Sequence, residues 1–366
     1  MTFSLDPRIV NNKNLDKLMT MFNKTLVPYK SFLGYIQLFR AFAIFLVVAT
    51  HTTAVFSWNN NDLIYRLLEL IYSNGTVLFV FKAGYLFQHL SYKFNTRQYY
   101  ISKLKNVISP YILVSIPAIL FFTTFQHREV VLWHIYQKPV WMQIIYFYIT
   151  GGHLAPLWFV PMIALFYIIA PLLIKADKSK WFYFCLPAFF LVSHYVGRGS
   201  VINNFMHFFS AYVFGMFCSH YKNNVNVWLS KRYFLSTIAA VYIGLIYFGL
   251  YSADIHLGSF IYFQKIFLCM LVLGIFVKLA QKGETRLAQT IANTSFGVFF
   301  IHSYVLGFAK IISNQISQLY STHQSLINGD PFLHLLATII VLFVSIKTVL
   351  AVKYFFNNRS RFLIGS

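Results

Sequence analysis

Ten apolar stretches, each long enough or nearly long enough to cross a lipid bilayer as a helix, constrain this 366-residue chain more than any other feature. Hydrophobic residues make up 58% of the chain and charged residues only 11%, which sets it apart from soluble domains. The sequence therefore predicts an all-α fold, a polytopic membrane helix bundle of about ten transmembrane helices. The predicted spans are residues 34–57, 74–92, 107–125, 155–174, 181–196, 203–219, 233–251, 258–279, 292–313 and 332–355.

Two regions leave alternatives in the number of spans. Residues 181–196 form the weakest of the ten stretches because they are the shortest. Residues 129–150 are also apolar, but Pro139 and three charged or histidine residues interrupt them. We expect this second region to be a re-entrant or interfacial element, and an eleventh span is the alternative.

The basic residues are distributed unevenly about the predicted spans. The formal net charge of +21 invites a nucleic-acid partner, but the placement of the charges favours membrane topology. When Lys and Arg are assigned to alternating sides, 23 fall on one side and 5 on the other, with two more inside the membrane. The positive-inside rule places the richer side, and both termini, in the cytoplasm. We predict a multi-pass protein of the cytoplasmic (inner) membrane and no nucleic-acid partner; binding of anionic lipid or an acidic ligand by the basic loops is a second possible use of the charge.

One membrane domain accounts for most of the chain. We place it at residues 34–355, between a cytoplasmic N-terminal tail over 1–33 and a cytoplasmic C-terminal tail over 356–366. Residues 1–33 are polar and lack the pattern of a signal peptide, so the first span is expected to direct its own insertion.

Arg40 and His51 lie eleven residues apart in the first span, FRAFAIFLVVATH. An eleven-residue step turns a helix by about three full circles, so both side chains leave on one face, about 16 Å apart along the axis. Ionisable groups in a membrane helix are costly unless they face protein or a wet cavity, and they indicate function by default. The alternative is an Arg that extends to the interface and a His that makes a helix contact.

Lys82 in the second span and His302 in the ninth are predicted to reach the same depth as His51, and Lys265 a similar one. Together they predict a polar, water-accessible cavity inside the bundle. All nine acidic residues fall in tails or loops, so neither a carboxylate pair nor a metal site is expected at that depth. A His that deprotonates a hydroxyl, with cations that stabilise developing negative charge, suits acyl transfer.

Several segments in sequence order resemble the acyltransferase-3 family of membrane acyltransferases, over residues 34–366. FRAFAIFLVVATH is similar to the family's Arg-x10-His signature, and VLFVFKAGYLF to its second-helix segment. KLKNVISPY is similar to a segment that runs from Arg to Pro-Tyr in the family. GHLAPLWFVPMIALFYIIAPLL, SFGVFFIHSYVL and the SRFLIGS ending are similar to later family elements.

The resemblance implies an O-acyltransferase that uses a cytoplasmic acyl-CoA, most simply acetyl-CoA, and acts on a hydroxyl of a surface or secreted polysaccharide or a lipid-linked glycan. It implies His51 as the catalytic histidine, Arg40 as its partner, and Lys103 or Lys105 at the site where the family usually has Arg. A Lys in place of that Arg lacks the planar fork that binds phosphate through two hydrogen bonds. Lys82 is an unusual neighbour in the second-helix segment.

The basic rim of Arg40, Lys103 and Lys105 is expected to hold the phosphates of the donor, although orientation by charge explains these residues equally well. Lys82 and His302 are expected to line the site. Trp158, with the weaker candidate His153, is expected to contact the acceptor sugar; an aromatic belt at the interface is the alternative.

Three other functions agree with the same residues, and acylation of a small molecule or a lipid in place of a glycan is one of them. A transporter or flippase for a glycan or a lipid-linked saccharide would also need a cationic cavity, although no inverted repeat is apparent. Transfer of a succinyl instead of an acetyl group would suit the additional cation Lys82.

Overall fold

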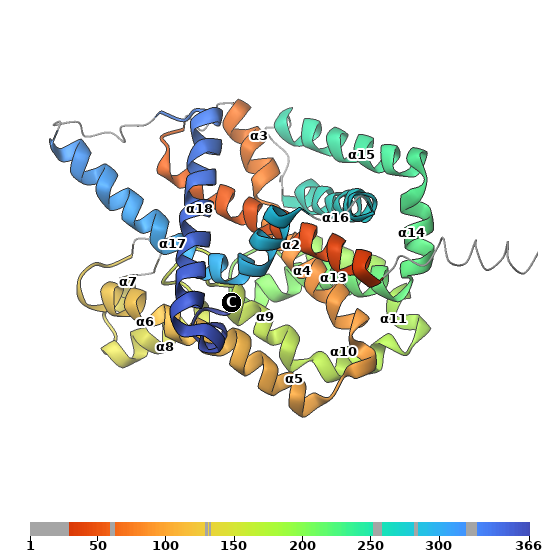
Figure 1. Cartoon of the computed structure of the whole chain (residues 1–366), viewed down its shortest axis with the longest axis horizontal. Coiled ribbons are helices and arrows are strands. Elements are labelled where there is room, and N and C mark those ends of the chain that lie inside the picture. The colour runs from red at the N-terminus through yellow and green to blue at the C-terminus, as the bar shows by residue number, and fades with distance from the viewer. Residues whose placement is uncertain are drawn as a thin grey trace, which may run out of the picture.

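The computed structural model describes residues 29–58, 63–128, 131, 133–251, 258–281, 285–319 and 328–366. Every regular element in these residues is helical, and the β-bridge between Ser57 and Asn328 is isolated. The helices pack into a bundle (Figure 1), which confirms the predicted all-α polytopic fold. The predicted tail over 1–33 falls almost wholly outside the described residues.

Eight helical segments of the described chain are long and apolar enough to cross a membrane, and a bent pair, α9 with α10, would make a ninth. The two helices of this pair meet at 55°. The helices at the predicted spans are α2 (Tyr29–Thr52), α3 (Leu63–Tyr72) with α4 (Gly75–His89), α5 (Thr96–Lys103) with the π-helical η3 (Leu104–Ile108) and α6 (Ser109–Thr124), α9 (Phe159–Ile168) with α10 (Ala170–Asp177), α12 (Leu186–Tyr195), α13 (Val201–His220), α15 (Arg232–Tyr251), α16 (Gly258–Ala280), α17 (Arg286–Leu319) and α18 (Pro331–Phe356).

The two ambiguous regions form short helices. The predicted span 181–196 is divided between α11 (Lys180–Phe184) and α12, whose ten residues are fewer than a perpendicular crossing needs. Residues 129–150 contain α7 (Trp133–Tyr136) and α8 (Val140–Thr150), and Pro139 directly precedes α8. At eleven residues, α8 is also too short for a span, in keeping with an interfacial or re-entrant element. The remaining elements are η1 (Thr53–Val55), η2 (Ser91–Lys93), α14 (Lys222–Ser230), η4 (Asn357–Arg359) and α19 (Ser360–Ile364).

Helix α2 lies inside the bundle and packs against α4, α16, α17 and α18. Several of its side chains, among them Ala43, Ile44, Val48 and Ala49, have no exposed surface. Every residue of α2 from 34 to 52 is buried or half-buried, so this helix lies between its neighbours and not on the outer surface of the bundle. The helix that carries Arg40 and His51 is therefore surrounded by protein.

Helices α4 and α13 cross at very short range because both have glycine at the contact. A Cβ added to Gly84 would lie 1.9 Å from the Tyr212 carbonyl oxygen, and one added to Gly215 would lie 2.0 Å from the Phe81 carbonyl oxygen. Small residues allow such backbone approach in membrane bundles, where van der Waals packing holds helices together. This crossing fixes the second wall of the site relative to α2.

Gly151 reverses the chain after α8. Its φ is +68°, a left-handed conformation that favours glycine, and a Cβ there would lie 2.5 Å from the carbonyl carbon of Leu157. The chain from 151 to 157 therefore folds tightly back on itself and delivers Trp158 to the start of α9.

The predicted C-terminal tail over 356–366 returns to the bundle, where α19 packs on α6 and α18. The Ser366 hydroxyl accepts a hydrogen bond from the Gly297 amide at 2.9 Å, and the Ser360 hydroxyl donates to the Ser366 carbonyl oxygen at 2.7 Å.

Candidate active site

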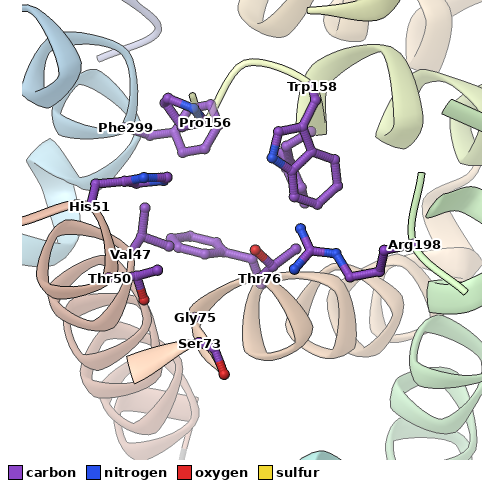
Figure 2. A pocket seen from close by; sticks show the side chains of 12 residues that line it. Val47, Thr50, His51, Ser73, Gly75, Thr76, Pro156, Trp158, Arg198 and Phe299 are labelled. Atoms are coloured by element: carbon purple, nitrogen blue, oxygen red, sulfur yellow. The ribbon is translucent and has the colours of Figure 1, made fainter. Parts of the chain in front are cut away.

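His51 lines a cavity of about 80 Å³ at the end of α2. The cavity lies between the last turns of α2, the start of α4 with Gly75 and Thr76, and the residues that lead into α9. Arg198, which lies between α12 and α13, completes it. Figure 2 shows the His51 ring and the Arg198 guanidinium directed toward the space between them.

His302 of α17 is the ring neighbour of His51, with centroids 5.4 Å apart. Its Nδ1 donates a hydrogen bond to the Val298 carbonyl oxygen at 2.9 Å, because a carbonyl can only accept. In the neutral ring Nε2 is then an acceptor, and this buried nitrogen has no hydrogen-bond partner in the described part of the chain. The structure thus brings together the predicted residues His51 and His302, and it supplies the neighbour that could orient His51.

A larger pocket of about 760 Å³ adjoins the His51 cavity and shares Trp158 and Arg198 with it. Its other walls include Arg128, Gly152 and Asn204, from segments that the predicted topology places on the outer side of the membrane. We call it the outer pocket.

The indole of Trp158 lies among protein groups at the boundary between the His51 cavity and the outer pocket. The Arg198 guanidinium lies over the indole at 4.8 Å from the ring centroid, and the Phe208 ring lies 6.1 Å away at an interplanar angle of 21°. Trp158 therefore borders both spaces and supports Arg198, and its contact with an acceptor sugar stays a prediction.

A third pocket, of about 450 Å³, lies at the opposite end of α4 and includes Lys82 and Lys103. We call it the inner pocket, because the loop that forms its rim is predicted to be cytoplasmic. The Lys103 ammonium lies over the rings of Tyr99 and Tyr167, at 5.0 and 4.8 Å from their centroids. Lys105 is exposed on the π-helical turn and lines none of these pockets, so Lys103 is the one of these two lysines that lines a pocket.

Lys82 reaches the inner pocket and not the His51 cavity. Its ammonium lies 5.2 Å from the centroid of the Phe79 ring, and Phe79 lines the His51 cavity. About one helical turn of α4 therefore separates the two spaces.

Arg40 lies near a group of cations toward the inner side. The charges of Arg40 and Lys103 repel the ammonium of Lys82, and Arg361 of α19 repels Arg40. The buried Nε of Arg40 has no partner among the described residues. Arg40 lines neither the His51 cavity nor the inner pocket, and the helical rise places it about 16 Å from His51.

His153 is buried beside the site without facing it. Its Nδ1 donates to the Phe147 carbonyl oxygen at 3.2 Å, and its ring packs against Tyr111 and Tyr148. Burial lowers the pKa of His153 to about 4, opposed by that hydrogen bond and assisted by the charge of Arg128. Its contacts are those of a packing residue of the outer wall.

Two further residues fall outside the cavity although the sequence suggested a role near His51. Lys265 is only 6% exposed and lies near His207 and Arg198. The charge of Arg198 repels the Lys265 ammonium. Glu69, a carboxylate that follows the first span in the sequence, lies exposed on α3 and does not line the cavity.

The sequence interpretation missed Arg198, which it counted only as a loop charge. A signal was present, because Arg198 is one of only 5 basic residues on the predicted outer side and has glycine on both sides. The positive-inside rule does not explain a cation on the predicted outer side, so Arg198 is expected to have another role there.

The fold is an all-α polytopic bundle, and an imidazole pair lies between pockets at its two ends. These two features define a multi-pass membrane protein with an internal site. A comparison with protein families identifies the class: a family model described as "Acyltransferase domain" matches residues 33–351. The chain belongs to the acyltransferase-3 family and is a membrane acyltransferase. No curated protein and no solved structure matches it significantly.

Proposed function

We propose that this acyltransferase transfers an acyl group, in the simplest case acetyl, from an acyl-CoA to a hydroxyl of a surface or secreted polysaccharide or lipid-linked glycan. The observation that carries the proposal is the position of His51. Its cavity adjoins the outer pocket and is separated from the inner pocket by about one turn of α4. A base at this junction can meet a donor from one side and an acceptor from the other.

The chemistry requires a single proton carrier. His51 accepts the proton of the acceptor hydroxyl while the hydroxyl oxygen attacks the thioester carbonyl carbon. The carbon–sulfur bond of the resulting tetrahedral intermediate then breaks, and the protonated imidazole returns its proton to the CoA thiolate. The acceptor oxygen becomes the ester oxygen, and the products are the acylated glycan and free CoA.

The start of α4 supports stabilisation of the intermediate. Gly75 and Thr76 line the His51 cavity in the first turn of this helix, where backbone N–H groups lack partners within the helix. Such groups, at the positive end of the helix dipole, stabilise an oxyanion that forms in front of them.

The donor would occupy the inner pocket. Lys103 and Lys82 line this pocket, and Lys93 lies at its rim, so that three cations face the phosphates of a nucleotide-bearing thioester. Arg40 lines neither pocket and lies about 16 Å along the helix from a carbonyl at His51. Its proposed role is therefore electrostatic, because its charge acts together with that of Lys103 on Lys82 in the inner pocket. The acyl end must pass Phe79 to reach the base.

The small volume of the His51 cavity favours a small acyl group. About 80 Å³ accommodates an acetyl group, whereas a fatty acyl chain would need a longer channel. A cytoplasmic-membrane location, with the inner pocket toward the cytoplasm, is part of the proposal and rests on the charge asymmetry of the loops.

Replacement of His51 tests the proposal. We expect His51→Gln to abolish O-acylation of the surface glycans, measured by mass spectrometry of glycans from cells that carry the variant as their sole copy. His334→Gln is a matched control: His334 is also buried in a membrane helix, donates through Nε2 to the Ala49 carbonyl oxygen, and lines no described pocket near His51. Normal acylation by an inserted His51→Gln protein would show that His51 is not the base.

A further inference from the structure

We propose that the acceptor carries an acid group, a carboxylate or a phosphate, and that Arg198 binds this group at the boundary between the His51 cavity and the outer pocket. The inference rests on the proposed function and specifies the substrate class of the same site.

Arg198 is the first observation. Its side chain lines both spaces, and Figure 2 shows its guanidinium directed into the His51 cavity beneath Trp158. The guanidinium contacts the indole ring at 4.8 Å but makes neither a hydrogen bond nor an ion pair with any described residue. An arginine fork held in place by an aromatic ring, with its N–H donors free, is preorganised for a planar carboxylate or a phosphate.

A second arginine faces the same outer pocket. Arg128 uses Nη1 to donate to the Gly152 carbonyl oxygen at 2.7 Å, which anchors one edge of its guanidinium. The protein around both arginines lowers the pKa of each guanidinium, mainly by removing water from the charged group. The charge of Arg198 also acts on buried Lys265.

The described residues provide no negative charge to balance these cations. None of the residues that line the His51 cavity or the outer pocket is Asp or Glu. Two arginines that line one pocket without a counter-ion among the described lining residues become a favourable arrangement when an anion occupies that pocket.

Membrane topology does not account for this cluster. The positive-inside rule favours few cations on the outer side, where the sequence places only 5. Two of these 5, Arg128 and Arg198, converge on one pocket next to the proposed base. A bound anion explains why they are there.

The acid group and the reacting hydroxyl would belong to one acceptor. With the anion on Arg198, a neighbouring hydroxyl of the same or the next sugar can extend across the cavity toward His51, which lies on the opposite wall (Figure 2). Arg198 is thereby a specificity-determining residue, because it contacts the acceptor away from the reacting atoms.

The test compares acceptors that differ only in charge. Purified protein is given labelled acetyl-CoA and an oligosaccharide that contains a uronic acid, its carboxyl-reduced neutral counterpart, or a phosphorylated counterpart. We expect the wild type to prefer one of the acidic acceptors, and Arg198→Gln to reduce the acidic-to-neutral ratio of kcat/KM by about tenfold or more, through KM. Arg198→Lys should restore only part of this ratio, and Lys138→Gln, at an exposed outer cation, serves as the control.

Three results would overturn the inference. A wild type that transfers acetyl equally well to charged and neutral acceptors would remove its basis. If Arg198→Gln lowers the activity toward both acceptors in the same proportion, Arg198 stabilises the tetrahedral intermediate and does not recognise the acceptor. If Arg198→Gln changes the preference for succinyl-CoA over acetyl-CoA and leaves the acidic-to-neutral acceptor ratio unaltered, Arg198 binds an acid group of the donor and not of the acceptor.

These outcomes are separable from failure of the proposed function. A protein that cleaves acetyl-CoA in a His51-dependent manner, yet ignores acceptor charge, contradicts the present inference alone. A well-folded protein that cleaves no acyl-CoA contradicts both.

Discussion

The ring of His51 lies next to a second imidazole, that of His302. In most hydrolases and transferases with a catalytic His, a carboxylate orients the ring, but none of the described residues that line this cavity is acidic. The neighbour of the His51 ring is instead His302, whose Nδ1 donates to the Val298 carbonyl oxygen and whose buried Nε2 has no hydrogen-bond partner among the described residues. We therefore propose that His302 positions the His51 ring through their contact, with ring centroids 5.4 Å apart.

Substitutions at His302 separate positioning from packing. We expect His302→Phe, which keeps a ring but no nitrogen, to lower kcat about tenfold or more with little change in the KM for acetyl-CoA. His302→Gln, whose amide retains hydrogen-bonding groups, should recover part of the loss. Equal rates for the Phe variant and the wild type across the pH range would show that His302 only fills space.

His153 makes the stability of the protein depend on pH. Its pKa of about 4 in the folded protein lies below the usual 6.5, so the unfolded chain binds more protons between these values. Stability contributed by the neutral ring is present above about pH 6.5 and is lost as the pH falls toward 4, at up to about 1.4 kcal/mol per pH unit.

The His153→Gln variant tests this dependence. Gln can still donate to the Phe147 carbonyl oxygen but cannot become charged, so its thermal midpoint in detergent should fall less between pH 7 and pH 4.5 than that of the wild type. His134→Gln, at an exposed histidine of α7, should follow the wild type. Parallel slopes for all three proteins would contradict the assignment.

At the scale of elements, the crossing of α4 and α13 determines whether the inner pocket exists. Lys82 and Ala83 of α4 and Tyr212 of α13 line that pocket, and Gly84 sets the distance between the two helices. Gly84 is thus required for the close packing of α4 against α13, which its position in the sequence alone does not indicate.

Enlarging the glycine tests the crossing. Gly84→Val should prevent correct folding, because its Cβ would overlap the Tyr212 carbonyl oxygen. We expect a large loss of monodisperse protein in size-exclusion chromatography. Gly244→Val in α15, where no atom lies within 4 Å of an added Cβ, should purify normally. Comparable yields for the two variants would show that the crossing adjusts.

The sequence predicted the elements well where hydrophobic length decided the structure. Long apolar segments such as α2 and α18 appear as predicted, because only a helix of that length satisfies both the backbone and the lipid. The weak segment at 181–196 became the short α12, where Pro187 near the start of the helix and Gly197 after it limit the helical length.

The site was predictable along one helix and not between helices. Helical phase placed Arg40 and His51 on one face, but depth alone could not distinguish Lys82 from His302. His302 faces His51, whereas the rotation of α4 directs Lys82 to the inner pocket. Arg198 comes from a loop, so no periodicity indicated that it enters the cavity.

At the scale of the whole molecule, the two ends of the bundle have separate pockets that approach each other at His51. The inner pocket is lined by Lys82, Lys103 and aromatic rings, and the outer pocket by two arginines. This arrangement favours a reaction in which donor and acceptor never share one aqueous compartment. In the proposed reaction the acyl end of the donor would pass Phe79, which lines the His51 cavity and whose ring centroid lies 5.2 Å from the Lys82 ammonium.

Transfer across a sealed membrane tests the central claim most directly. Purified protein is placed in liposomes with labelled acetyl-CoA only on the face that carries Lys103 and an acidic oligosaccharide only on the opposite face. We predict that the label appears on the oligosaccharide with the wild type and with His334→Gln, and that none is transferred by His51→Gln. Labelling that persists without His51, or that occurs only when both substrates share one compartment, would contradict an imidazole acting between the two pockets.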